Sequence, residues 1–278
     1  MKSLYDNTSY KISKLVTNSY STSFSLGIRL LAPNIRPAIY SIYGFVRYAD
    51  EIVDTFHSFD QETLLDDFIK EYNKALDKKI SLNPILNSFQ EIVHKYGLYD
   101  LVNDFLDSMK MDLEKKDYNT DQEYKQYIYG SADVVGLMCL LVFVNGDRQR
   151  FEELKPNAMA LGSAFQKVNF LRDIKNDFEN LGRSYFPNVD KFNFNDQKKY
   201  DIIDDIEKDF AMAYEGIQKL PFNAKLGVFI AYKYYLSLLN KLKNKDSKQI
   251  LETRIRISNP HKIWIFFKSL VRHKLNLI

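Results

Sequence analysis

Residues that break helices are scarce in this chain, which has ten glycines and seven prolines among its 278 residues. That share is about half of what is usual in a globular protein. Apolar residues recur every three or four positions along most of the sequence, whereas the alternation typical of β-strands is rare. The pattern predicts an all-α fold of long helices. Because no flexible linker or low-complexity tract interrupts it, residues 1–278 are expected to form one domain.

The turn-forming residues divide this pattern into separate helices. Pro37 suits a first helical turn, and Pro156 is expected in the first turns of its helix or at a later start. Gly182 is expected to end the longest helix, and Pro187 and Asn188 begin the clearest loop. The expected helices span residues 8–30 (with a break near 19–23), 36–56, 61–77, 83–95, 99–116, 121–145, 150–181, 198–219, 222–244 and 260–275.

Charge and cysteine content exclude several classes of protein. With 39 Lys and Arg against 36 Asp and Glu, the net charge of +3 is too small to indicate nucleic-acid binding. A single cysteine, Cys139, excludes a disulfide framework, and it is expected to be a buried, unreactive thiol. The N-terminus has no apolar leader, and the longest apolar run, 134–144, is shorter than the ~20 residues that span a bilayer. We expect a cytoplasmic protein without an obligate protein partner.

Aromatic residues are numerous, with 20 Phe, 19 Tyr and one Trp. Each ring buries a large apolar area. Their number therefore predicts either a dense core or an internal cavity that rings enclose.

A polar stripe runs along the predicted helix 36–56, although apolar residues surround almost its whole circumference. Such a helix should be largely buried. Two carboxylates one turn apart repel each other and are costly to bury unless a cation compensates them. The stripe has spacings of four, three and four residues, which fall within roughly 60° of one another; its members are Tyr43, Arg47, Asp50 and Asp54.

A second stripe lies on the predicted helix 150–181, with spacings of three, four and four residues, and Arg172 flanks it. Oxygen ligands suit hard cations, and Mg²⁺ typically joins a few carboxylates to substrate phosphates. Two such stripes facing each other would form an acidic cavity, in which Arg47 and Arg172 could receive phosphate oxygens. The second stripe consists of Gln166, Asn169, Asp173 and Asp177.

Ordinary surface charge is the alternative for any single pair of aspartates one helical turn apart. We assign Asp66, Asp67, Asp204 and Asp205 to this class. The coincidence of two pairs, each accompanied by an amide, an aromatic ring or a guanidinium on an apolar helix, argues for a site instead.

These motifs resemble those of the squalene/phytoene synthase family of head-to-head prenyltransferases, from about Ser19 to Leu275. The family's aspartate-rich motif is similar to residues 47–54, and its Gln-x-x-Asn-x-x-Arg-Asp-x-x-x-Asp motif is matched from Gln166 to Asp177. The Gly-Arg-x-Tyr-x-Pro that follows is matched at residues 182–187. The resemblance implies an isoprenoid-synthase-type helical bundle around a central apolar cavity.

Three further stretches resemble the family. Its Ser-x-Ser-Phe segment is similar to residues 21–24, and its Tyr-x-Tyr segment is similar to 127–136, although Asp133 replaces a usual Gly and Ile128 a common Cys. Tyr235 and Arg254 look like substrate contacts, with a core-facing ring as the alternative for Tyr235. The substrate-binding residues that the resemblance implies are Tyr20, Ser21, Thr22, Ser23, Tyr43, Arg47, Gln166, Arg172, Tyr235 and Arg254.

The resemblance also implies the chemistry. Several Mg²⁺ ions would bridge two allylic diphosphates, with Asp50, Asp54, Asn169, Asp173 and Asp177 as metal ligands. The four aspartates and Tyr129 are the implied catalytic residues. Ionisation yields an allylic cation, then a cyclopropylcarbinyl diphosphate, and rearrangement gives a 1′–1 linked hydrocarbon. Tyr43 and Tyr129 are expected in the pocket, and either a tyrosine or the released diphosphate would accept the final proton.

The expected reaction joins two geranylgeranyl diphosphates into phytoene without NADPH. Because no membrane anchor follows the last helix, the chain resembles bacterial carotenoid enzymes more than eukaryotic squalene synthases. The alternative is a C30 dehydrosqualene or squalene synthase that uses two farnesyl diphosphates.

Two other kinds of protein fit these residues less well. A non-catalytic relative would have lost aspartates that this chain retains, and a head-to-tail elongase or terpene cyclase favours Asp-Asp-x-x-Asp, where this chain has Asp-Glu-x-x-Asp.

Membrane binding through the last helix is a third alternative. Its apolar stripe is Ile263, Phe266, Phe267, Leu270 and Val271, with Trp264 beside it and basic residues around it. The stripe either docks on the protein core or binds the inner face of a membrane peripherally.

Overall fold

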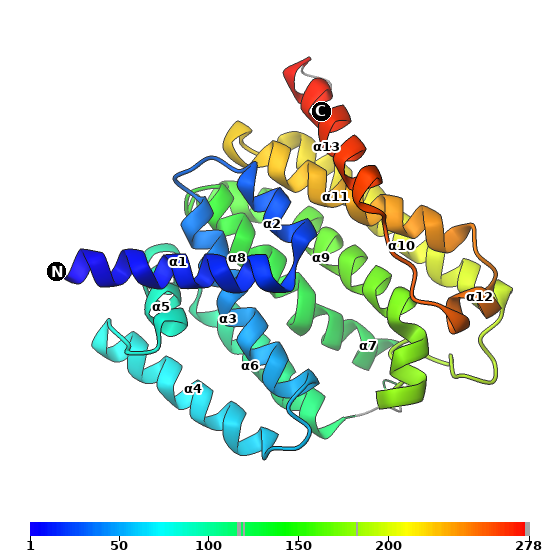
Figure 1. Ribbon diagram of the computed structural model, residues 1–278, viewed down its shortest axis with the longest axis horizontal. Helices are drawn as coiled ribbons and strands as arrows, with labels where there is room; N and C mark the ends of the chain where they lie inside the picture. Colours follow the sequence, from blue (N-terminus) through cyan, green and yellow to red (C-terminus); the bar gives the residue numbers. More distant parts are fainter. Residues whose placement is uncertain (116–117, 119, 182, 276–278) are drawn as a thin grey trace.

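The computed structural model describes residues 1–115, 118, 120–181 and 183–275, and within them it contains helices and no β-strand. Figure 1 shows these helices gathered into one bundle. The all-α prediction is confirmed. The elements are α1 (Lys2–Tyr20), α2 (Thr22–Arg29), α3 (Arg36–Asp54), α4 (Gln61–Lys78), α5 (Pro84–Tyr96), α6 (Tyr99–Glu114), α7 (Asp121–Ile128), the π-helical turn η1 (Tyr129–Asp133), α8 (Val134–Phe143), α9 (Arg148–Asn176), the π-helical turn η2 (Asp177–Leu181), α10 (Asp196–Lys219), α11 (Phe222–Lys243), α12 (Ser247–Glu252) and α13 (Asn259–Lys274).

The expected break in the first helix falls at Ser21. Its backbone is extended, with φ −142°, and its hydroxyl accepts a hydrogen bond from the Phe24 amide at 3.2 Å, which caps α2. The helix before the break begins at Lys2 rather than at residue 8, so this boundary was wrong. The first turns carry little apolar periodicity, and a tertiary contact holds them: the Tyr5 hydroxyl donates to the Ser81 carbonyl at 2.6 Å.

Pro156 is the ninth residue of α9, which begins at Arg148. It therefore lies just beyond the first two turns and does not mark a later start of the helix. The helix begins at Arg148, because the Asp147 carboxylate accepts a hydrogen bond from the Arg150 amide at 3.1 Å. Phe151 and Leu154 are buried, so core packing stabilises the turns before the proline despite the hydrogen bond that it removes. The short helix α12 was missed, and the expected stop at Gly182 lies outside the described residues.

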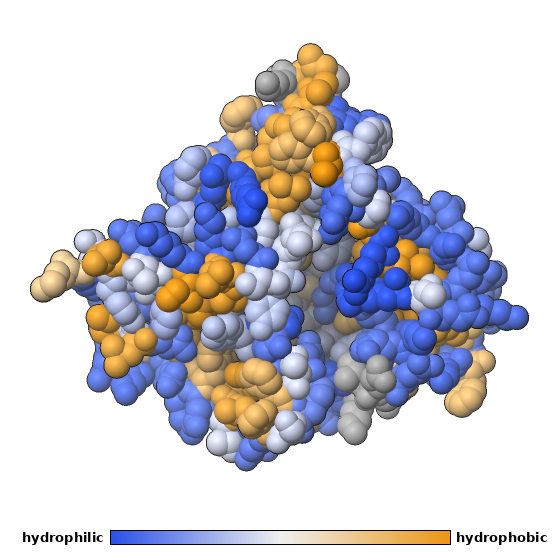
Figure 2. Space-filling view, viewed as in Figure 1, coloured by the Kyte–Doolittle hydropathy of each residue, from blue (hydrophilic) through white to orange (hydrophobic). Residues whose placement is uncertain are grey.

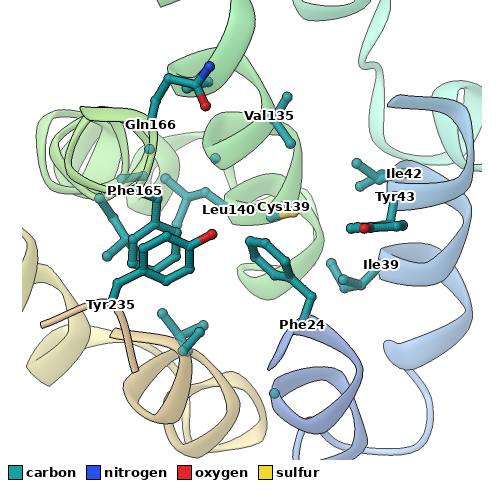
Figure 3. Close-up of a pocket in the computed structure, with 18 of the residues that line it drawn as sticks. Phe24, Ile39, Ile42, Tyr43, Val135, Cys139, Leu140, Phe165, Gln166 and Tyr235 are labelled. Carbon is teal, nitrogen blue, oxygen red and sulfur yellow. The ribbon is translucent and has the colours of Figure 1, made fainter. Parts of the chain in front are cut away.

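The long helices surround an internal space, with α3 and α9 on opposite sides (Figure 3). Helix α8 packs on both of them, and α10 and α11 pack on α9 and on each other. Helices α4, α5 and α6 cover the outer side of α3, which explains why α3 is buried around most of its circumference. The two helices that carry the polar stripes are thus held by the core of the bundle.

One helical stretch in the described part of the chain, Asp121–Phe143, is long and apolar enough to cross a membrane by length and composition alone. It comprises α7, η1 and α8, and 61% of its most hydrophobic window is buried inside the protein. In this fold it is a central core helix.

Candidate active site

A cavity of about 560 Å³ lies between α2, α3, α8, α9, α10 and α11. Its lining changes in character along the two stripe helices. On α3 it passes from Ile39 and Ile42 to Arg47 and Asp50, and on α9 from residues 158–161 to 166–172. Figure 3 shows the apolar part, in which Phe24, Phe165 and Tyr235 point into the space between α3 and α9. The cavity therefore has an apolar body and a polar mouth, at the C-terminal ends of α3 and α9.

On the α3 side of the mouth, Arg47 and Asp50 line the cavity. The Arg47 guanidinium forms an ion pair with Glu51 and stacks 4.4 Å from the centre of the Tyr20 ring. The Nε atom of Arg47 is buried and has no hydrogen-bond partner among the described residues. One donor of this guanidinium therefore remains available to a ligand.

On the α9 side, Gln166, Asn169 and Arg172 line the mouth. Asn169 hydrogen-bonds the Tyr235 hydroxyl, while its Oδ1 atom is buried without a partner in the described part of the chain. Arg172 forms an ion pair with Asp173, and the Arg254 Nε atom lies 2.8 Å from Asp173 Oδ1. Asp173 is therefore held between two guanidinium groups at the rim.

Of the four stripe carboxylates, Asp50 lines the cavity, whereas Asp54, Asp173 and Asp177 lie outside its lining. Burial raises the pKa of Asp50 to about 8, with a further contribution from Asp54 and an opposing one from Arg47. Burial likewise raises the pKa of Asp177 to about 7, and both Asp173 and Asp54 add to the increase. Because Asp54 on α3 acts on Asp177 at the end of α9, these side chains form one acidic cluster across the mouth.

Comparison with known proteins identifies this arrangement. The family described as squalene/phytoene synthase matches residues 17–194. The chain belongs to the squalene/phytoene synthase family. Members of this family are prenyltransferases, so the chain is a transferase of isoprenoid biosynthesis.

Two curated relatives are similar over most of their length. The phytoene synthase of Arthrospira platensis is 29% identical, over 86% of this chain and 85% of its own. The 4,4′-diapophytoene synthase of Staphylococcus haemolyticus is 26% identical, over 92% of this chain and 86% of its own. The fold is shared with a crystal structure of a dehydrosqualene synthase in complex with ligand, which superposes with a TM-score of 0.81 at 19% identity and covers 97% of this chain and 98% of that one.

The site also contains a buried acid that sequence reasoning missed. Asp112 on α6 is 2% exposed, and the Arg183 guanidinium donates to its Oδ1 atom at 3.1 Å. The Tyr127 hydroxyl donates to its Oδ2 atom at 3.1 Å. Burial raises the pKa of Asp112 to about 6, although the Arg183 guanidinium lowers it. The negative charge of Asp54 adds to the increase. An aspartate on an ordinary amphipathic helix carries no sequence signal of this role, although Arg183 belongs to a recognised family motif.

Tyr129 does not lie in the main cavity, contrary to the prediction. Its hydroxyl donates to Asp104 Oδ2 at 2.8 Å, and the ring lines a second cavity between α7, α9 and α10. The π-helical turn η1 changes the helical register at this point and directs Ser131 and Ala132 into the main cavity instead. Among the two predicted pocket tyrosines, only Tyr43 lines the main cavity.

Thr22 and Ser23 are also absent from the cavity lining, whereas Tyr20 and Ser21 belong to it. Helix α2 starts directly after Ser21, and its cavity face carries Phe24, Gly27 and Ile28. Thr22 is turned outward and accepts a hydrogen bond from Lys262 Nζ at 3.0 Å. Of the four consecutive residues predicted to bind substrate, 20–23, the first two therefore line the cavity and the last two do not.

Cys139 lines the main cavity rather than the core behind it. Burial raises the pKa of its thiol to about 12, so the group stays protonated and acts as a small apolar part of the wall.

The mouth offers oxygen atoms that suit a divalent cation. The unpartnered Asn169 Oδ1 and the clustered carboxylates are oxygen donors of the kind that Mg²⁺ prefers. No three Asp, Glu, His or Cys side chains within the described residues converge closely enough to form a metal site by themselves. The donor set fits ions that complete their coordination with oxygens of a bound substrate.

Proposed function

We propose that this enzyme joins two geranylgeranyl diphosphates head to head into phytoene, with release of diphosphate. The observation that carries the proposal is an apolar cavity with a polar mouth, which Arg47 and Asp50 line on one side and Asn169 and Arg172 on the other. Asp54, Asp173 and Asp177 lie outside the lining, and the first two interact electrostatically with Asp177. Such a site binds a long hydrocarbon chain at one end and a metal-associated anion at the other. The similarity to the phytoene synthase of Arthrospira platensis supports the C20 substrate.

The polar mouth would bind the diphosphates. Arg47, Arg172 and Arg254 supply the positive charge, and their planar guanidinium groups match phosphate oxygens in pairs. Mg²⁺ held by Asp50, Asp54, Asn169, Asp173 and Asp177 would neutralise the diphosphate and favour its departure. Because Asp173 is paired with Arg172 and Arg254, we expect these ion pairs to rearrange when substrate binds.

The apolar body would protect the cation. Cleavage of the first allylic C–O bond leaves a carbocation and diphosphate, and the double bond of the second substrate attacks the cation. Loss of a proton closes a cyclopropane, and a second ionisation with rearrangement and proton loss gives the 1′–1 linked product. Phe24, Phe165 and Tyr235 surround this space, with the Phe165 and Tyr235 rings stacked 3.9 Å apart. Their faces can stabilise positive charge, and the dry wall keeps water from quenching it.

Diphosphate, rather than a tyrosine, is the base in this proposal. Burial raises the pKa of Tyr43 to about 12, so its hydroxyl stays protonated at neutral pH and donates hydrogen bonds. Burial also raises the pKa of Tyr235, although Arg172 opposes it. The released diphosphate carries its own basic oxygens at the mouth, next to the carbons that lose protons.

Product identification tests the proposal. Purified full-length enzyme is incubated with Mg²⁺ and either geranylgeranyl or farnesyl diphosphate, without NADPH, and the hydrocarbon is identified by mass spectrometry. We expect a C40 hydrocarbon to form faster than any C30 product. A C30 hydrocarbon formed in preference would overturn the choice of substrate while leaving the site intact.

The second candidate is a C30 synthase that uses two farnesyl diphosphates. The similarity to the 4,4′-diapophytoene synthase of Staphylococcus haemolyticus, which extends over 92% of this chain, favours it. The same assay with NADPH added separates its two forms, because squalene requires a hydride donor and dehydrosqualene does not.

A further inference from the structure

Helix α13 presents its more apolar face to solvent. Ile265 and Ser269 are its most buried side chains, and Ile265 packs on Ile230 and Tyr234 of α11. By contrast, Ile263, Trp264, Phe267, Val271 and Leu275 are each 56–63% exposed. These five positions fall within roughly 120° of one another around the helix axis. The stripe predicted from the sequence is therefore split: Phe266 and Leu270 are half-buried, and the other members face outward.

The exposed apolar surface continues onto the start of α11. Phe222 is 75% exposed, and its ring lies 4.6 Å from the His273 ring of α13. Figure 2 shows a hydrophobic area over α13, at the top of the view. We call the surface made by Phe222, Ile263, Trp264, Phe267, Val271 and Leu275 the α13 face.

Positive charge accompanies this face. The sequence of α13 contains no Asp or Glu. The Lys268 ammonium lies 4.6 Å from the centre of the Trp264 ring. Lys233 Nζ and Arg272 Cζ lie 5.4 and 5.8 Å from the centre of one ring, that of Phe229. Burial lowers the pKa of Lys233, and Arg272 and Lys268 lower it further. Burial lowers the pKa of His273, and the positive charge of Lys225 lowers it further. An anionic partner is complementary to such a surface, whereas a second copy of the chain would bring like charges together.

The α13 face begins beside the mouth of the cavity. Lys262 Nζ donates to Thr22 Oγ1 at 3.0 Å, next to Ser21, which lines the cavity. The Tyr234 hydroxyl donates to the Lys262 carbonyl at 2.9 Å and joins α13 to α11. Both helices that support α13, α2 and α11, are walls of the cavity. A partner bound to the α13 face would therefore lie close to the substrate entrance.

We propose that the α13 face docks on a lipid bilayer that contains anionic headgroups. The apolar side chains enter the boundary between headgroups and acyl chains, and Lys225, Lys262, Lys268 and Arg272 contact the anionic headgroups. Docking brings the cavity mouth to the surface where prenyl diphosphates reside, a benefit that rests on the proposed function. Binding itself requires neither substrate nor catalysis.

Trp264, the chain's only tryptophan, reports on this docking directly. Full-length enzyme is mixed with vesicles of phosphatidylcholine alone, or with about one third phosphatidylglycerol. We expect a blue shift of Trp264 emission and quenching by brominated acyl chains with the anionic vesicles, and at least about tenfold weaker binding to neutral ones. Emission that anionic vesicles leave unchanged would overturn the proposal.

Sedimentation with vesicles distinguishes binding through the α13 face from nonspecific binding of the protein to lipid. Trp264→Glu combined with Phe267→Glu should reduce binding to anionic vesicles at least about tenfold. Leu82→Glu is the matched control, because Leu82 is 93% exposed and lies between α4 and α5, so its binding should equal that of the unchanged chain. Circular dichroism checks that each variant is folded. Equal loss in the control, or no loss in the double variant, would contradict membrane docking through α13.

Light scattering tests the competing occupant. If the α13 face joined two copies of the chain, the unchanged chain would be a dimer without vesicles and the double variant would be a monomer. That result, together with no binding to vesicles, would replace membrane docking with dimer formation. We expect the same oligomeric state for both. Because no step of the experiment uses substrate, failure of docking is distinguishable from failure of the proposed function.

Discussion

Individual carboxylates at the mouth are held in an unfavourable state that a ligand would relieve. Burial and neighbouring acids raise the pKa of Asp50 to about 8 and that of Asp177 to about 7. With these pKa values and no cation, Asp50 is mostly protonated at neutral pH and Asp177 is about half protonated. Asparagine has the shape of the protonated acid, so it removes the charge with little effect on the fold. This separates the contribution of charge to catalysis from its contribution to stability.

Asp50→Asn and Asp173→Asn are each expected to reduce kcat by at least about 10³-fold, because each removes a carboxylate proposed to hold Mg²⁺. Asp50→Asn should leave the thermal midpoint unchanged or raise it, since its pKa shows that the charged form is disfavoured. Asp67→Asn, an exposed site paired with Lys70, is the control and should retain full activity. Substantial turnover by either site variant would refute its assignment as a metal ligand.

Asp133 is a second residue whose protonation is set by burial, and it is one of the departures from the family pattern. Burial, and then Asp209, raise its pKa to about 8, although Lys167 opposes them, and its Oδ1 atom has no partner in the described residues. The folded state therefore holds a proton that the unfolded chain loses near pH 4. The free energy of unfolding should fall as pH rises from about 4 to about 8.

Asp133→Asn should remove that part of the pH dependence. The two chains should be similarly stable below about pH 4, and the variant should be more stable by roughly 5 kcal/mol near pH 8, because each unit of the pKa difference corresponds to about 1.4 kcal/mol. Urea denaturation of both chains at several pH values measures this difference. Parallel stability profiles would show that Asp133 does not change its protonation on folding.

Helices in the cavity wall approach each other closely at two crossings, between α2 and α11 and between α9 and η1. A Cβ atom on Gly227 of α11 would lie 2.6 Å from the Gly27 carbonyl oxygen of α2, and one on Gly162 of α9 would lie 2.7 Å from the Ala132 oxygen of η1. Neither backbone oxygen can move without shifting a helix. Glycine is scarce in this chain, yet these two glycines stand where helices around the cavity meet.

Gly227→Ala is expected to destabilise the protein by about 1–3 kcal/mol, because the added methyl group forces α2 and α11 apart. Gly27→Ala tests the same crossing more gently, since its Cβ would lie 3.3 Å from the Gly227 oxygen. It should therefore cost less. Chemical denaturation gives both values, and a smaller loss for Gly227→Ala than for Gly27→Ala would contradict this account of the crossing.

Across the whole molecule, the near-neutral net charge of +3 combines an acidic mouth with a basic surface at α13. The mouth joins α3 from one side of the bundle with α9 from the other. A ligand that binds both stripes would cross-link the two sides and stabilise the fold by linkage. Because no three Asp, Glu, His or Cys side chains of the described residues converge on one point, we expect the anion to supply the remaining ligands of the proposed Mg²⁺.

Mg²⁺ and inorganic diphosphate together should raise the thermal midpoint by about 5 °C or more at concentrations roughly 100 times their Kd. Either one alone should raise it much less. Thermal unfolding followed by circular dichroism provides the measurement, with Asp173→Asn as the variant that should lose the joint effect. Equal shifts from Mg²⁺ alone would mean that the protein binds the ion without the anion.

The sequence by itself determined most of the helices, the two polar stripes and the family, because helical periodicity, capping and motif spacing are local properties of the chain. Those local patterns predicted that Asp50 and Asp173 belong to stripes, and the family resemblance implied that the stripes share a site. Only the tertiary structure decided that Tyr129 turns away, that Asp112 pairs with Arg183 behind the mouth, and that α13 exposes its apolar face. These outcomes depend on a π-helical turn and on contacts between distant helices, which no local pattern encodes.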